Sequence, residues 1–139
     1  GRGVMFFPAV SHAEMVEVMR GAAAVVNSSK SEGMCGSLLE AMAVGTPTLS
    51  RAVSGNLELI LHRQTGLLYS SPAECVALGK ELLGADGALR LSLTKHACRY
   101  VEEHHSAALE KRVFSRALAL LHPPAKRGGV KVDDLILAA

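Results

Sequence analysis

The feature that most constrains the fold is an alternation of short apolar runs and helix-forming segments in the first half of the chain. Residues 22–26 form a short apolar run that stops at a polar cluster, residues 27–31. Residues 38–44 are good helix formers, and Gly45 is placed to end their helix. A further strand candidate covers residues 46–50. This order of strand, loop, helix and strand predicts a parallel sheet flanked by helices.

The same alternation is expected before residue 22. Residues 4–7 are apolar and end at Pro8, a pattern that predicts a buried strand. Ser11 and Glu14 then form the S-x-x-E pattern of a capping box, which predicts a helix that runs to Gly21.

After residue 50 the pattern becomes increasingly helical. A turn is expected over residues 54–56 and a fourth extended piece over residues 66–69. A capping pattern with proline at the first helical position predicts a helix over residues 72–84. Asp86 is expected to cap the next helix and Ser106 the last one. The helix after Asp86 has an apolar face made of Leu89, Leu93, Ala97 and Val101.

Composition sets the class of protein. With 139 residues, 49% of them hydrophobic, the chain suits one ordered α/β domain over residues 1–122, and residues 123–139 are expected to form a tail. The net charge is only +2 and aromatic residues make up 4%, which argues against a nucleic-acid partner. No apolar run reaches the roughly 18 residues of a membrane span.

The three cysteines are widely spaced and form neither a paired framework nor a CxxC motif, so we expect a reducing, cytoplasmic setting. The six histidines lack the spacing of metal ligands, and no metal site or cofactor is expected. Because the chain begins at Gly1 without a methionine, we expect it to be a fragment. The methionines expected to fill the core are Met15, Met19 and Met42.

Two glutamates and several glycines lie around the loop that joins the strand predicted at residues 22–26 to the next helix. Glu32 lies in the loop and Glu40 one turn into the helix, so we expect both to face one small crevice. The N–H groups of Gly36, Ser37 and Leu38 belong to the first turn of that helix, where a phosphate is favoured. Carboxylates beside a phosphate are expected to accept hydrogen bonds from neutral hydroxyl groups, such as those of ribose and other sugars.

Residues 32–47, with the sequence EGMCGSLLEAMAVGTP, resemble the E-x7-E signature of group 1 retaining glycosyltransferases, which have the two-domain GT-B fold. The resemblance extends over residues 4–121. It implies a Rossmann-like parallel sheet with helices on both faces, in the C-terminal, nucleotide-sugar-binding half of such an enzyme, incomplete at its N-terminus. The implied function is transfer of a sugar from a nucleoside-diphosphate sugar to the hydroxyl of an unknown acceptor.

The resemblance also implies a role for each residue of the loop. Glu32 is the catalytic candidate beside the donor sugar, and Glu40 binds the ribose hydroxyls. Many family members read E-G-F-G, so the second glycine is displaced by one position here, which we interpret as a difference in donor preference. The residues implied to cradle the donor sugar and the diphosphate are Gly33, Met34, Cys35, Gly36, Ser37 and Leu38.

The family's basic residues for the diphosphate, and its N-terminal acceptor domain, would precede Gly1, so the chain alone is expected to be inactive. The alternative is a non-catalytic nucleotide-sugar-binding or protein-interaction module on the same fold. A phosphorylase-like relative using pyridoxal phosphate ranks far behind, because no lysine lies in a convincing cofactor pocket. Lys30 is expected to face solvent and Glu58 to begin a helix, whereas Gly55 either approaches a ligand or serves a turn.

Overall fold

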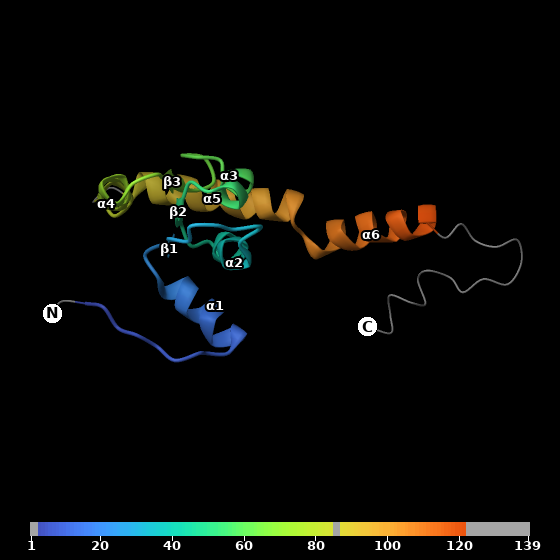
Figure 1. The fold of residues 1–139 in the computed structure, drawn as a ribbon, viewed down its shortest axis with the longest axis horizontal. Coiled ribbons are helices and arrows are strands. Elements are labelled where there is room, and N and C mark those ends of the chain that lie inside the picture. Colours follow the sequence, from blue (N-terminus) through green and yellow to red (C-terminus); the bar gives the residue numbers. More distant parts are fainter. Residues whose placement is uncertain (1–2, 85–86, 122–139) are drawn as a thin grey trace, which may run out of the picture. The chain divides into compact units, whose positions relative to one another are not determined.

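The computed structural model describes residues 3–84 and 87–121. The chain divides into two units, Gly1–Glu102 and Glu103–Ala139. The tail expected at residues 123–139 and the cap expected at Asp86 lie outside the described residues. In chain order the elements are α1 (His12–Gly21), β1 (Val25–Asn27), α2 (Gly36–Ala43), β2 (Thr48–Arg51), α3 (Ser54–Leu59), β3 (Leu67–Tyr69), α4 (Pro72–Leu82), α5 (Ala88–His104) and α6 (Ala107–Leu121) (Figure 1).

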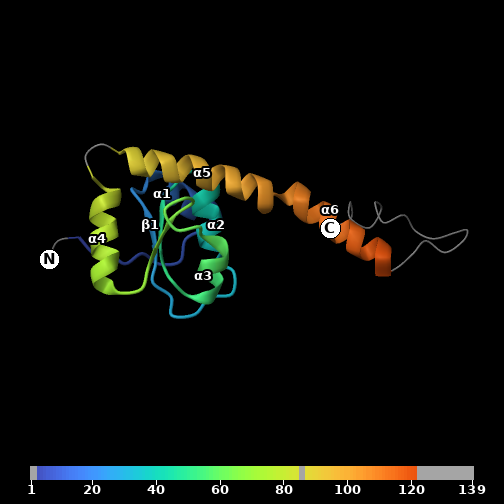
Figure 2. The same ribbon diagram turned by 90° about the horizontal axis from the view of Figure 1, so that it is seen from above.

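The three strands form one parallel sheet in the order β1-β2-β3, as the sequence predicts. Asn27 pairs with Ser50, and Arg51 pairs with Tyr69, so the carboxyl ends of the strands share one edge. Helices cover both faces, with α4 on one side of the strands and α2 and α3 on the other (Figure 2). Ligands of open α/β sheets bind at this carboxyl edge.

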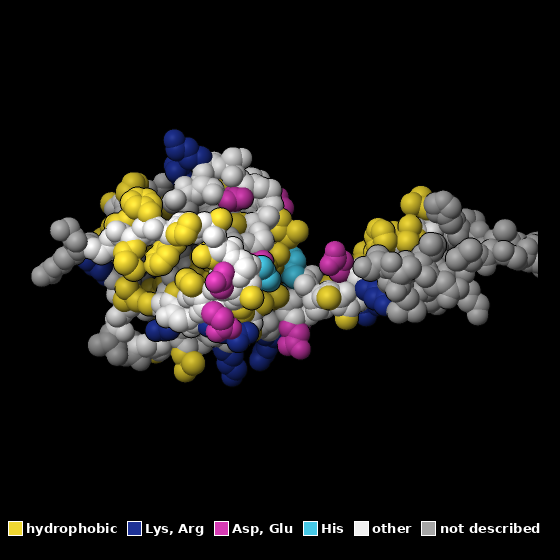
Figure 3. Space-filling model, turned by 90° about the horizontal axis from the view of Figure 1, so that it is seen from below, with side chains coloured by type: hydrophobic (Ala, Val, Ile, Leu, Met, Phe, Trp, Pro, Cys, Tyr) yellow, Lys and Arg dark blue, Asp and Glu magenta, His cyan; other side chains and the backbone are white. Residues whose placement is uncertain are grey.

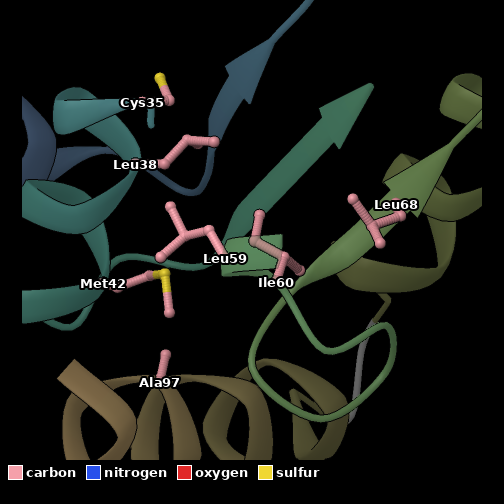
Figure 4. Close-up of a cluster of buried hydrophobic side chains, with 7 residues drawn as sticks. All are labelled: Cys35, Leu38, Met42, Leu59, Ile60, Leu68 and Ala97. Atoms are coloured by element: carbon pink, nitrogen blue, oxygen red, sulfur yellow. The ribbon is translucent and has the colours of Figure 1, made fainter. Parts of the chain in front are cut away.

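The core consists of two apolar clusters on opposite faces of the sheet, because neighbouring residues of β3 point in opposite directions. Leu68 joins the first cluster and Leu67 the second. The first comprises Cys35, Leu38, Met42, Leu59, Ile60, Leu68 and Ala97, which lie between α2, the strands and α5 (Figure 4). The second comprises Leu49, Leu67, Tyr69, Leu78, Leu82 and Leu93.

The caps confirm several helix boundaries that the sequence predicts. Ser11 and Glu14 form a reciprocal capping box at α1. The Ser71 hydroxyl accepts from the N–H of Glu74 at α4, but the Glu74 carboxylate accepts from the N–H of Ser70, so only half of that box forms. In the second unit, the Ser106 hydroxyl likewise accepts from the N–H of Leu109, in the first turn of α6. Helix ends without such partners would leave polar groups unpaired.

The strand predicted over residues 4–7 is wrong. These residues have no regular structure, and all four side chains are more than 70% exposed: Val4, Met5, Phe6 and Phe7. An apolar run becomes a strand only where its backbone groups meet a neighbouring strand. Within the described residues, β1 pairs with β2 alone, and residues 4–7 are not hydrogen-bonded to its other edge.

Two smaller expectations also need correction. The turn expected over residues 54–56 is the first turn of α3, because the N–H groups of Asn56 and Leu57 both donate to the carbonyl of Val53. Met15 is 40% exposed and does not fill the core, whereas the other two methionines named for the core are buried. Hydrophobic side chains also cover much of the face of the first unit that Figure 3 shows.

Candidate functional site

The site is built around Asn27, the last residue of β1. Its side-chain Nδ2 donates to Glu32 Oε1 over 3.1 Å and to Cys35 Sγ over 3.4 Å. Its Oδ1 accepts from the N–H of Ser29 over 3.3 Å. One amide therefore ties the end of the strand to both ends of the loop that precedes α2. Glu32 thus has a defined position although it lies in a loop.

A second buried amide, that of Asn56 in α3, holds Asn27 in turn. Asn56 Nδ2 donates to Asn27 Oδ1 and to the carbonyl of Arg51, each over 3.0 Å. The Asn56 side chain is fully buried, and its Oδ1 has no partner among the described residues. The loops that follow β1 and β2 are therefore joined by a continuous set of hydrogen bonds.

Gly55 brings the same two loops into direct contact. A Cβ atom added at Gly55 would overlap the carbonyl oxygen of Gly33 and lie 2.6 Å from the carbonyl oxygen of Glu32. Only glycine fits against this backbone. The structure thereby answers the question that the sequence leaves open, because Gly55 accommodates the loop of Glu32.

Hydrogen bonding keeps the Glu32 carboxylate ionised. Bonds from Ser29 and then from Asn27 lower the pKa of Glu32 below its ordinary value of 4.5, and they outweigh the opposing effect of desolvation. Glu32 is half-buried. At neutral pH it is an oriented negative charge at the carboxyl edge of the sheet.

Glu40 has a different partner. His12 Nε2, at the start of α1, lies 3.1 Å from Glu40 Oε1, and the two side chains are 74% and 38% exposed. A crevice shared by the carboxylates of Glu32 and Glu40 stays a prediction. The Glu40 carboxylate remains accessible from solvent.

The loop residues expected to form a cradle are placed in two ways. Cys35 and Leu38 are buried, and the N–H of Leu38 donates to the carbonyl of Cys35 over 3.1 Å, so this amide is already engaged. The other cradle residues, Gly33, Met34, Gly36 and Ser37, are exposed.

The start of α2 keeps open donors. No side chain caps this end of α2 in the part of the chain that the structure describes. The first-turn N–H groups of Gly36 and Ser37 therefore have no intrahelical acceptor. An anion placed there would meet free donors and the positive end of the helix dipole.

From the sequence, His12 and Asn56 were missed as parts of this site, and Asn27 was included only in the polar cluster that ends a predicted strand. The available signal was a polar residue at the end of a predicted strand and an asparagine directly after Gly55. Within residues 3–84 and 87–121, no group of three or more His, Cys, Asp or Glu side chains could hold a metal ion. No helix in these ranges is long and apolar enough to cross a membrane.

Comparison with known proteins adds a family and a fold. The family model described as "Glycosyl transferases group 1" matches residues 1–98. "Glycosyltransferase 1 domain-containing protein 1" of Xenopus tropicalis is 38% identical over 112 residues, which cover 81% of this chain and 32% of that relative. The chain therefore spans about a third of the length of this curated relative.

Solved structures share the fold at low sequence identity. Anabaena Alr3699/HepE in complex with UDP-glucose matches with a TM-score of 0.71 and 18% identity, over 78% of this chain and 30% of that chain. The same protein in complex with UDP matches with a TM-score of 0.70 and 18% identity, over 74% and 29%. The expected α/β fold with a parallel sheet is thereby confirmed.

Proposed function

Because the chain belongs to the group 1 glycosyltransferases and has a fold of the GT-B kind, we propose that it carries the donor-binding part of a retaining sugar transferase. The donor is a nucleoside-diphosphate sugar, and the acceptor supplies a hydroxyl group. The observation that carries the proposal is the hydrogen-bonded loop of Glu32, which leads from the end of β1 to the open start of α2. The complexes of HepE with UDP-glucose and with UDP support a nucleotide sugar as the ligand class.

Glu40 is assigned to the ribose. Its carboxylate is accessible on α2, where it can accept a hydrogen bond from a ribose hydroxyl group. A charged acceptor bonded to neutral hydroxyls contributes about 1.5–3 kcal/mol per bond. Its loss therefore weakens donor binding by about 10- to 100-fold.

The diphosphate is assigned to the loop and the start of α2. The free N–H groups of Gly36 and Ser37 lie at the helix N-terminus, and Gly33 and Met34 are exposed beside them. Donors fixed before the reaction stabilise negative charge as it develops on the departing diphosphate. We propose that these amides do so without a metal ion, in which case a chelator leaves donor binding unchanged.

Glu32 is assigned to the reacting sugar. A sugar that loses its leaving group develops positive charge at the anomeric carbon. The ionised, oriented carboxylate of Glu32 can stabilise that charge, and Asn27 prevents it from turning away. Removing the Glu32 charge should therefore lower the rate of transfer more than it lowers the affinity for the donor.

The full-length protein that contains this chain provides the test of catalysis, since we propose that the acceptor domain lies outside the 139 residues. Release of nucleoside diphosphate from a panel of donor sugars measures turnover. We expect Glu32→Gln to lower kcat by about 10²-fold or more, and Glu40→Ala to act chiefly on KM.

Glu58→Ala is the matched control, because Glu58 is an exposed glutamate on α3 and has no assigned role. Equal turnover by wild type, Glu32→Gln and Glu40→Ala would contradict the assigned roles. Donor binding without any turnover by the wild type would favour the alternative, a non-catalytic nucleotide-sugar-binding module.

A further inference from the structure

A second concave site lies at the same edge of the sheet. It is a pocket of about 400 Å³, within the size range of ligand sites, at the carboxyl ends of all three strands. Val26 of β1, Arg51 of β2 and Tyr69 of β3 form its floor, and the first turns of α4 form a wall. Neither Glu32 nor Glu40 lines it.

Among the residues that line the pocket, the charged one is Arg51, which is positive. None of the lining residues is Asp or Glu. In the part of the chain that the structure describes, the Arg51 guanidinium forms no ion pair. Burial raises the pKa of Tyr69, the neighbouring Cys75 thiol raises it further, and the positive charge of Arg51 opposes both effects. Arg51 and Tyr69 both line the pocket.

The remaining lining offers both donors and apolar surface. Ser28 and Ser70 contribute hydroxyl groups, while Val26 and Val76 are 56% and 58% exposed. The donors of the first turn of α4 are partly in use, because Ser71 accepts from the N–H of Glu74. An anion here would therefore be held by the guanidinium and the serine hydroxyls.

Asn27 connects this pocket to the Glu32 loop. Its side chain holds Glu32, and its backbone carbonyl accepts from the Tyr69 hydroxyl over 3.0 Å. The pocket thus adjoins the proposed donor site but does not share its two glutamates. A ligand group here would approach the reacting sugar from the side of β2 and β3.

We propose that the Arg51 pocket is an anion subsite that takes a phosphate or carboxylate group of the acceptor, an inference that rests on the proposed function. A guanidinium that forms no ion pair with the described residues matches an oxyanion by charge and by its forked donors. The exposed valines suit an apolar portion of the same molecule. The acceptor is therefore an acidic molecule, and Arg51 selects it.

The test is a titration of the isotope-labelled chain with sodium phosphate at constant ionic strength, followed by amide NMR shifts, with and without saturating UDP. We expect saturable shifts at Ser28 and Ser70 in the wild type. Arg51→Gln should raise the phosphate concentration at half-saturation by about tenfold or more. Lys30→Gln, which removes an exposed cation of the neighbouring loop, should leave that concentration unchanged.

Three results would overturn the inference: no saturable shift in the wild type, equal shifts in wild type and Arg51→Gln, or loss of the shifts when UDP is bound. The spectrum of each variant reports whether it is folded, and Arg51→Lys, which keeps the charge, should bind with intermediate strength. A parallel titration with sodium acetate distinguishes a carboxylate from a phosphate. UDP binding in the same samples reports separately on the proposed function.

Discussion

The backbone of Gly33 packs directly against the α-carbon of Gly55, so the loop that carries Glu32 rests on the start of α3 without any side chain between them. The two residues lie in different βα units of the sheet. This contact limits how closely the Glu32 loop can approach α3. The loop therefore has a rigid support on one side and the Asn27 amide on the other.

Gly55→Ala should displace the loop. A Cβ at this position collides with backbone, which cannot move aside as a flexible side chain would. We expect the free energy of unfolding to fall by about 1–3 kcal/mol or more. Denaturant unfolding checks this, with Gly21→Ala as the control because nothing lies within 4 Å of a Cβ added there. Equal stability of both variants would show that the contact does not constrain the loop.

Asn56→Ala should destabilise the chain although Asn56 touches no ligand in the proposed site. The change removes two hydrogen bonds and leaves Asn27 Oδ1 and the Arg51 carbonyl without that donor. Buried groups left unpaired cost about 1–3 kcal/mol. Chemical denaturation measures the loss, and Ser54→Ala, at the exposed start of the same helix, serves for comparison. A loss no greater than that of Ser54→Ala would contradict the bridging role of Asn56.

Glu32 should contribute to stability in a way that depends on pH. Its pKa is lower in the folded chain than its ordinary value of 4.5, so its contribution is complete above 4.5 and is lost as pH falls through the folded value. The difference in unfolding free energy between wild type and Glu32→Gln should therefore shrink on acidification. Carboxyl NMR titration should show the pKa of Glu32 rising in Asn27→Ala, because one of the lowering bonds is gone. An unchanged pKa in that variant would argue against the Asn27 contact.

Most of the fold follows from local patterns, because capping residues and short apolar runs act over a few neighbouring residues. The capping box at Ser11 and the helix end at Gly45, with φ +80°, are examples. Residues 4–7 fail for the opposite reason, since strand formation depends on a partner that local sequence does not specify.

The support of the candidate site depends on pairs distant in sequence. Asn27 and Asn56 are 29 residues apart, and His12 and Glu40 are 28 apart. Such pairs meet only after the βα units stack on the sheet. Sequence patterns therefore indicate which carboxylates to examine, while the structure identifies the residues that hold them.

The most direct test of the proposed donor site is binding of UDP, GDP and ADP to this chain by ligand-observed NMR, with Glu40→Ala and the control Glu58→Ala. We predict that one nucleotide binds selectively, that Glu40→Ala weakens this binding by about 10- to 100-fold, and that Glu58→Ala leaves it intact. A folded chain that binds none of the three, or that binds equally well after Glu40→Ala, would contradict the proposed donor site.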